Sequence, residues 1–152
     1  MPGLNRLEYN GEFWPKLILT VNDESILSWI ESHLYLVTLE PRDMKYDVLD
    51  NIKIDTSSAE KLAFAAYKCW DAILSMDIEK FGKYFRESFE AQITMFPNMV
   101  DDFILKTIKK YKGDAFGWKL SGAGGGGYLI LVSNKPVEGA IQIKIRRAVI
   151  SD

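Results

Sequence analysis

Residues 122–127 of this chain read Gly-Ala-Gly-Gly-Gly-Gly, so five of its 11 glycines fall in one short run. Glycine loses more backbone freedom on folding than any other residue, and such a cluster is favoured where the chain turns through positive φ or approaches another group closely. The flanking segments, 115–120 and 128–133, are apolar and favour strands. The run therefore predicts a connection between two strands whose bare backbone amides could cradle an anion such as phosphate.

Two other interpretations of the glycine run are a dinucleotide-binding loop and a hairpin without a ligand. Gly122, Gly124 and Gly127 fit the G-x-G-x-x-G pattern of dinucleotide-binding folds, but that pattern requires a following helix and a strand is expected here. A flexible hairpin without a ligand is the simplest alternative. Lys119 and Ser121 lead into the run and could contact a phosphate, although each alone is also typical of an ordinary strand position.

Composition excludes several classes of protein. The 152 residues suit one globular core, and the net charge of −2 argues against a nucleic-acid binder recognised by gross charge. Cys69 is the single cysteine, so no intramolecular disulfide can form, which suits a reducing compartment. No apolar stretch approaches the roughly 20 residues that span a bilayer, and the start lacks an apolar signal core. We expect a soluble, cytoplasmic protein that does not bind membranes.

Hydrophobic periodicity and turn signals predict an α+β sandwich, with a mainly antiparallel sheet and helices covering one face. A hairpin is expected around Asn10-Gly11, and the last strand should place Ile141, Ile143 and Ile145 on one side. The expected strands are a hairpin over 5–21 and single strands over 34–38, 115–120, 128–133 and 140–147. A short helix over 25–31 should be capped by Asn22 or Asp23. Three further helices should start at a Ser57-x-x-Glu60 capping box, at Asp77 and at about Asn98.

Conventional catalytic groups are sparse. His33 is the only histidine, which excludes a histidine metal cluster, and its place before an apolar strand indicates a structural role. Cys69 lies on an apolar helix stripe beside Trp70 and is expected in the core. No pair of carboxylates has a spacing that singles it out for acid–base chemistry. The sequence therefore identifies neither a catalytic residue nor a metal ligand.

Residues 119–128, Lys-Leu-Ser-Gly-Ala-Gly-Gly-Gly-Gly-Tyr, resemble the third, C-terminal signature of the GHMP kinase superfamily. This superfamily includes galactokinases, homoserine kinases, mevalonate kinases and bacterial heptose-phosphate kinases. Residues 3–9, the strand 34–38 with Arg42 beyond it, and residues 143–147 are also similar to the branch of D-glycero-D-manno-heptose 7-phosphate kinases.

The resemblance implies a GHMP-type C-terminal domain with a ferredoxin-like α+β fold over 23–152, and an N-terminal hairpin over 1–22 that is a remnant of the other kinase domain. It implies ATP and Mg²⁺ as cofactors and a sugar or sugar phosphate as substrate. The nucleotide- or phosphate-binding residues that it implies are Lys119, Ser121, Gly122, Ala123, Gly124, Gly125, Gly126 and Gly127.

The chain departs from the superfamily pattern in three ways. Its relatives are about twice as long, and the half absent here carries the Pro-x-x-x-Gly-Leu-Gly-Ser-Ser loop that cradles ATP, the acidic Mg²⁺ ligands and often a catalytic Asp. The stretch 38–42 lacks the glycine expected after Thr38. The connection over 134–139 is short for the helix that many relatives have there.

Two hypotheses follow. In the first, the chain is the C-terminal half of an ATP-dependent small-molecule kinase that is inactive alone, and it associates with an N-terminal half or with itself. In the second, it is a non-enzymatic module, phosphate-metabolite-binding or regulatory, that has kept the fold.

Overall fold

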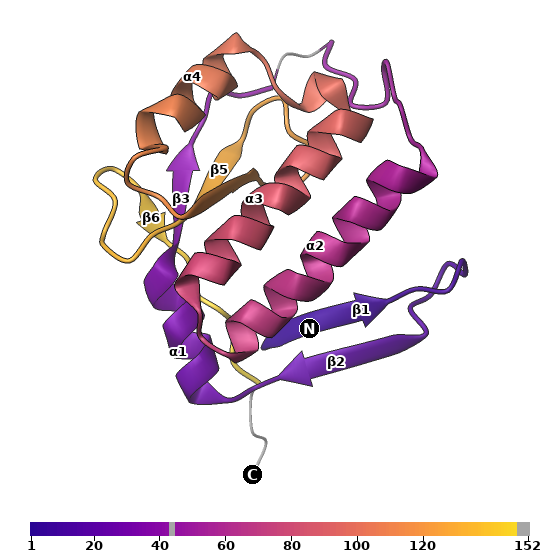
Figure 1. Ribbon diagram of the computed structural model, residues 1–152. Coiled ribbons are helices and arrows are strands. Elements are labelled where there is room, and N and C mark those ends of the chain that lie inside the picture. The colour runs from indigo at the N-terminus through magenta and orange to yellow at the C-terminus, as the bar shows by residue number, and fades with distance from the viewer. Residues whose placement is uncertain (43–44, 149–152) are drawn as a thin grey trace.

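The computed structural model describes residues 1–42 and 45–148, and Figure 1 shows their arrangement. In chain order the elements are β1 (Leu4–Glu8), β2 (Leu17–Val21), α1 (Glu24–His33), β3 (Leu34–Thr38), α2 (Thr56–Leu74), α3 (Ile78–Met95), a short 3₁₀ helix (Pro97–Met99), α4 (Asp102–Tyr111), β4 (Gly117–Leu120), β5 (Tyr128–Val132) and β6 (Ile141–Gln142).

The larger sheet has the strand order β4-β5-β3-β6, and each neighbouring pair is antiparallel. Leu36 of β3 lies opposite Ile130 of β5, which in turn lies opposite Lys119 of β4. Helices α2, α3 and α4 occupy the connection between β3 and β4. The α+β class and the antiparallel, ferredoxin-like arrangement predicted from the sequence are confirmed. The division into 1–22 and 23–152 stays a prediction.

Aspartates begin four helices, because each carboxylate accepts a backbone N–H that has no partner within the helix. Asp77 caps α3 as predicted, and of the two candidates predicted for α1, Asn22 and Asp23, Asp23 is the cap. The predicted capping box at Ser57 is wrong, because Asp55 accepts from the Ser58 amide at 2.8 Å and Ser57 lies inside the first turn of α2. The helix expected from Asn98 begins only at Asp102, since residues 97–99 form a separate 3₁₀ turn.

Two hydrophobic clusters hold the elements together. The main one joins the sheet to α3, α4 and the turn before α4, and its buried members are Val37, Leu39, Phe89, Met99, Ile104, Ile108, Trp118, Leu120, Leu129 and Leu131. The second joins the end of β5 to three helices, and its buried members are Ile30, Ala72, Ile73, Phe81 and Val132. The first cluster ends directly beneath the β4–β5 connection, because Leu120 and Leu129 flank that connection.

Helix α3 approaches the edge strand β4 so closely that glycine is required on both elements. A Cβ added to Gly82 would lie 2.3 Å from the Cβ of Phe116, and one added to Gly117 would lie 2.2 Å from the Gly82 carbonyl oxygen. Neither glycine has a positive φ, so the constraint is close approach and not backbone conformation. This contact sets the distance between α3 and the strand that leads into the glycine run.

The C-terminal segment differs from the strand predicted over 140–147. Only residues 141–142 pair as β6, and Ile141 is 59% exposed while Ile143 and Ile145 are half-buried. Beyond β6 the amide of Ile143 donates to the Leu34 carbonyl at 3.0 Å, and the Gly3 amide donates to the Arg146 carbonyl at 2.8 Å. The segment therefore ties the N-terminal hairpin to the main sheet.

Glu31, at the end of α1, is a buried carboxylate that fastens this segment. It accepts from the Ile145 amide at 2.7 Å, from Arg147 Nη1 at 2.6 Å and from Lys144 Nζ at 3.3 Å. These donors, with that of Arg147 foremost, lower the pKa of Glu31 below its ordinary value. Arg147 also binds the exposed Glu24, whose pKa falls to about 2 chiefly through that hydrogen bond.

We expect Gly82→Ala to destabilise the protein, even though alanine favours a helix interior by about 1 kcal/mol over glycine. Overpacking against Phe116 costs about 1–3 kcal/mol and outweighs that gain. Gly113→Ala is the matched control, because an added Cβ there meets nothing within 4 Å. The free energies of unfolding should fall for the first variant and stay the same or rise for the second; a stabilised Gly82→Ala would contradict the close contact.

We expect Glu31→Gln to lower the free energy of unfolding at pH 7 by about 2 kcal/mol, since hydrogen bonds to a charged, buried group are lost. The lowered pKa means that the folded state favours the ionised carboxyl. Its contribution is therefore present above the ordinary pKa of 4.5 and disappears as pH falls through the lowered value. Denaturation series at pH 7 and pH 3 should show the difference from wild type shrinking with acid. Glu24→Gln, at an exposed partner of the same Arg147, should have the smaller effect at pH 7.

Candidate functional site

The glycine run forms the connection between β4 and β5. The Ser121 amide donates to the Tyr128 carbonyl at 2.9 Å and closes the base of this hairpin. All five glycines of the run have φ between +67° and +140°, a region that other residues adopt only with strain. We call residues 121–127 the glycine loop.

Three of these glycines are also required by close packing. An added Cβ would lie 2.7 Å from the Met99 carbonyl oxygen at Gly124, 2.3 Å from the Tyr46 ring at Gly125 and 2.5 Å from the Glu40 carbonyl oxygen at Gly126. Nothing lies within 4 Å of the same point at Gly127. Gly124, Gly125 and Gly126 therefore allow the loop to pack closely against the rest of the chain, whereas Gly127 faces open space.

Arg42 and Tyr46 hold the outer side of the loop through its carbonyl groups. Arg42 Nε donates to the Gly124 carbonyl at 2.7 Å, and the Tyr46 hydroxyl donates to the Ala123 carbonyl at 2.7 Å. The guanidinium lies 5.8 Å from the centre of the Tyr46 ring. Burial raises the pKa of Tyr46, so its hydroxyl keeps the proton that it donates.

Backbone hydrogen bonds anchor the inner side. The Gly125 amide donates to the Met99 carbonyl at 2.8 Å, and the Gly127 amide donates to the Glu40 carbonyl at 3.1 Å. The amides of Gly122, Ala123 and Gly126 donate to no other group among the described residues. The Arg42 Nη2 atom lies 3.7 Å from the point where a Gly122 Cβ would stand, which places a positive charge beside this part of the loop. Free amides next to a guanidinium suit an anionic ligand.

The two residues that lead into the loop have different surroundings. Lys119 is half-buried and its Nζ donates to Ser88 Oγ on α3 at 3.0 Å, so in this structure it contacts that helix. Burial lowers the pKa of Lys119, because a neutral hydroxyl does not offset the loss of water around the ammonium. Ser121 is also half-buried and lies at the start of the loop, where its hydroxyl binds none of the described residues.

Sequence reasoning located the loop and noted Arg42 only as part of a resemblance. It missed Tyr46 and Met99, which fix the loop most directly. Tyr46 lies between the strand predicted over 34–38 and the helix predicted from Ser57, where no element was expected, and Met99 lies at the start of the helix expected from about Asn98. No local pattern marks either residue, since their role depends on contacts made across the fold.

A pocket of about 310 Å³ lies beside the glycine loop. Two of its side chains, Glu40 and Asp101, are acidic, and Phe103 adds a ring that is 43% exposed. Carboxylates repel phosphate and accept hydrogen bonds from hydroxyl groups. The pocket therefore suits a neutral, hydroxyl-bearing group better than an anion. Its lining is Glu40, Pro41, Tyr46, Asn98, Asp101, Phe103, Ile104, Gly125 and Gly126.

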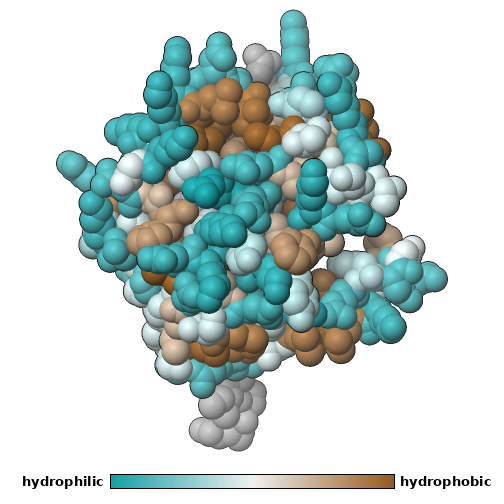
Figure 2. Space-filling model, in the orientation of Figure 1, coloured by the Kyte–Doolittle hydropathy of each residue, from teal (hydrophilic) through white to brown (hydrophobic). Residues whose placement is uncertain are grey.

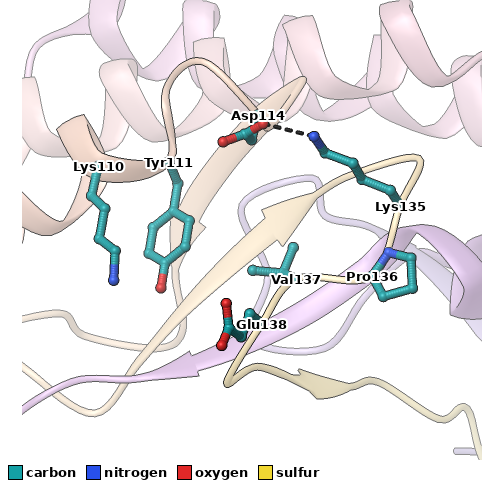
Figure 3. Close-up of a pocket in the computed structure, with 7 residues that line it drawn as sticks. All are labelled: Lys110, Tyr111, Asp114, Lys135, Pro136, Val137 and Glu138. Atoms are coloured by element: carbon teal, nitrogen blue, oxygen red, sulfur yellow. Dashed lines mark hydrogen bonds and ion pairs between the residues drawn. The ribbon is translucent and has the colours of Figure 1, made fainter.

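Figure 3 shows a second pocket, of about 530 Å³, at the end of α4 and the turn before β6. Its opposite charges are partly paired, as Lys135 Nζ lies 2.8 Å from an Asp114 carboxyl oxygen. Lys110 and Tyr111 extend side by side from α4, facing Val137 and Glu138 across the pocket. Because its lining includes no residue of the glycine loop, we treat it as separate from the candidate site.

His33 and Cys69 are placed as structural residues. His33 Nδ1 lies 2.6 Å from the Trp29 carbonyl oxygen, and the two rings are 4.6 Å apart. Burial raises the pKa of the Cys69 thiol to about 12, which leaves no thiolate to act as a nucleophile at neutral pH. Within 1–42 and 45–148, no three acidic, histidine or cysteine side chains gather as metal ligands would. None of the helices in those ranges has the length and apolar character to cross a membrane.

Comparison with known proteins gives similarity of fold only. No protein-family model matches the chain, and no curated protein matches it by sequence. A solved structure of a D-glycero-D-manno-heptose 1-phosphate kinase from Bacteroides thetaiotaomicron matches 89% of this chain and 41% of its own, with a TM-score of 0.50 and 15% identity. A putative sugar kinase from Campylobacter jejuni matches 78% of this chain and 31% of its own, with a TM-score of 0.45 and 17% identity.

The chain thus has a kinase-like fold, similar to part of a sugar kinase. It spans less than half the length of the two solved kinases.

We expect Tyr46→Phe to loosen the glycine loop. The substitution removes the hydrogen bond to the Ala123 carbonyl while the ring stays against Gly125, so the stability loss should be about 1 kcal/mol. Hydrogen exchange of the Gly125 and Gly127 amides, which bind the Met99 and Glu40 carbonyls, should accelerate more than exchange in β5. Tyr67→Phe is the control, because the Tyr67 ring contacts Arg6 and its hydroxyl binds none of the described residues. Equal exchange in both variants would show that Tyr46 does not hold the loop.

Proposed function

We propose that this chain is the C-terminal half of an ATP-dependent kinase for a sugar or sugar phosphate, and that its glycine loop lines the phosphoryl-transfer cleft. The observation that carries the proposal is the loop itself. The amides of Gly122, Ala123 and Gly126 donate to no other described residue, and the Arg42 guanidinium lies beside Gly122. The loop stands on a fold shared with part of a sugar kinase.

Such a loop can contribute to phosphoryl transfer without a catalytic side chain. The reaction depends mainly on positioning and on stabilising charge that spreads over the phosphoryl oxygens. Donors that are already fixed need no reorganisation when this charge develops. The contacts to Met99, Glu40, Arg42 and Tyr46 fix the glycine loop in advance, so its amides are suited to that role.

ATP and Mg²⁺ fit the described residues to different degrees. Backbone N–H groups and a guanidinium suit phosphate oxygens, so Gly122, Ala123, Gly126 and Arg42 would contact the nucleotide or the transferred group. Mg²⁺ would neutralise charge on the phosphates when bound. Since the described residues include no cluster of three potential ligands, we assign the Mg²⁺ ligands to the other half.

The pocket beside the loop supports a hydroxyl-bearing acceptor. Glu40, Asp101 and Asn98 line it with oxygen and amide groups, and it shares Gly125 and Gly126 with the loop. A sugar held there would place hydroxyl groups next to the amides that face the phosphate. One wall of the pocket and one wall of the phosphate site would then come from the same loop.

A phosphate-metabolite-binding module is the second candidate, and one observation favours it. Contacts within this chain hold the glycine loop on both of its sides, which favours a loop that keeps its shape in the chain alone. A module of this kind would bind phosphate ligands alone. Titration with ATP, ADP and sugar phosphates, followed by tryptophan fluorescence, separates the candidates: tight binding by the chain alone favours the module.

We expect the chain alone to phosphorylate no sugar, and we expect turnover when an N-terminal kinase half bearing the Gly-Leu-Gly-Ser-Ser loop is added. ADP release over a panel of sugars and sugar phosphates measures this. Arg42→Gln, which can keep a donor near Gly124 but removes the charge, should lower kcat about tenfold or more. Arg146→Gln, at an exposed residue of the C-terminal segment, is the control. A pair that associates but turns over none of these substrates would contradict the kinase assignment.

A further inference from the structure

The N-terminal hairpin exposes seven large apolar side chains. Leu17, Ile18 and Leu19 of β2 are 43%, 43% and 37% exposed, and because neighbouring residues of a strand point to opposite faces, both faces of β2 are uncovered. Strands with apolar residues on both faces are typical of sheets covered on both sides. Four more large apolar residues of the hairpin are exposed, namely Leu7, Tyr9, Phe13 and Trp14.

The outer edge of β2 is also unprotected. Among the described residues β2 pairs with β1 alone, in a two-stranded sheet. Soluble proteins usually guard an open edge with charge, proline, a bulge or a covering element. Residues 17–21 read Leu-Ile-Leu-Thr-Val and contain no charge and no proline. Figure 1 shows β2 along the lower margin of the molecule, where Figure 2 shows apolar surface.

We propose that β2 pairs antiparallel with β2 of a second copy of this chain, so that two hairpins form one four-stranded sheet. A two-stranded hairpin is marginal by itself, whereas sheets of three or more strands with an apolar face are stable. A twofold axis through β2 makes the contact self-complementary. Because β2 is uncharged, its own copy places no like charges opposite each other, and the net charge of −2 gives little overall repulsion.

The proposed interface is remote from the glycine loop. Figure 1 places the hairpin at the bottom of the molecule and the β4–β5 connection in its upper part. The second copy therefore leaves the candidate site open, and this inference does not depend on the proposed function. Substitutions in β2 can be tested without altering Arg42, Tyr46 or the loop.

Light scattering of the full chain over a wide concentration range tests for the dimer. Single cysteines then locate it, in the variants Leu17→Cys, Ile18→Cys, Leu19→Cys and Thr20→Cys. A twofold antiparallel pair brings a residue close to its own copy only near the axis, so mild oxidation should cross-link one or two neighbouring positions and not the others. The native Cys69 does not interfere, because it is largely buried and its pKa is raised to about 12.

A pair of lysine substitutions supplies the matched comparison. Ile18 and Leu7 are directly opposite each other in the hairpin and are 43% and 39% exposed, but only Ile18 lies on the proposed interface strand. Ile18→Lys should raise the dimer Kd about tenfold or more, because two like charges enter one interface. Leu7→Lys should leave it within about threefold.

A chain that stays monomeric at every concentration overturns the proposal, and the β2 edge would then be left for a different polypeptide. A dimer that forms equally in Ile18→Lys and gives no cross-link at 17–20 also overturns it, since the contact would lie elsewhere. Circular dichroism of each variant shows whether it has folded, and the cysteine series decides the question if a lysine variant does not fold.

Discussion

The seat of the glycine loop on Met99 connects the candidate site to the core. Met99 is 1% exposed, belongs to the main hydrophobic cluster, and accepts the Gly125 amide at 2.8 Å. The same loop rests on the carbonyl group of Glu40, just beyond β3, through the Gly127 amide. Packing of α3 and α4 on the sheet therefore determines where the loop lies. The loop itself carries no large side chain, so its place depends on these contacts with Met99 and Glu40.

Glu31 and Lys119 both have lowered pKa values, but for different physical reasons. Glu31 has three nitrogen donors within 3.3 Å, and its pKa is lowered because they stabilise the carboxylate. Lys119 donates to the neutral hydroxyl of Ser88, and its pKa is lowered because burial disfavours the ammonium. A lowered pKa therefore means that the charged form is stabilised at Glu31, an acid, and destabilised at Lys119, a base. Glu31 fastens the C-terminal segment, and Lys119 contacts α3 from the edge strand β4.

Local signals predicted most of the elements but not the contacts between them. The hairpin, the strand at 34–38 and the helix capped by Asp77 follow from turn, periodicity and capping patterns, and the structure has them. The strand over 140–147 was predicted too long, because its alternation is regular but only residues 141–142 meet a free edge of β3. The role of Tyr46 could not be predicted, because its partner Ala123 is 77 residues away. Local patterns carry no information about which distant segments meet.

The structure also changes what the glycine cluster means. Gly124, Gly125 and Gly126 have both a positive φ and a neighbour closer than 2.8 Å to an added Cβ, so packing within the chain is enough to require them. Gly122 and Gly127 have a positive φ but open space or only a distant atom above them. That open space is available to a ligand beside the loop. The amides that bind no other described residue, the open space at Gly122 and Gly127 and the Arg42 charge beside Gly122 therefore favour a ligand, whereas the number of glycines in the run does not.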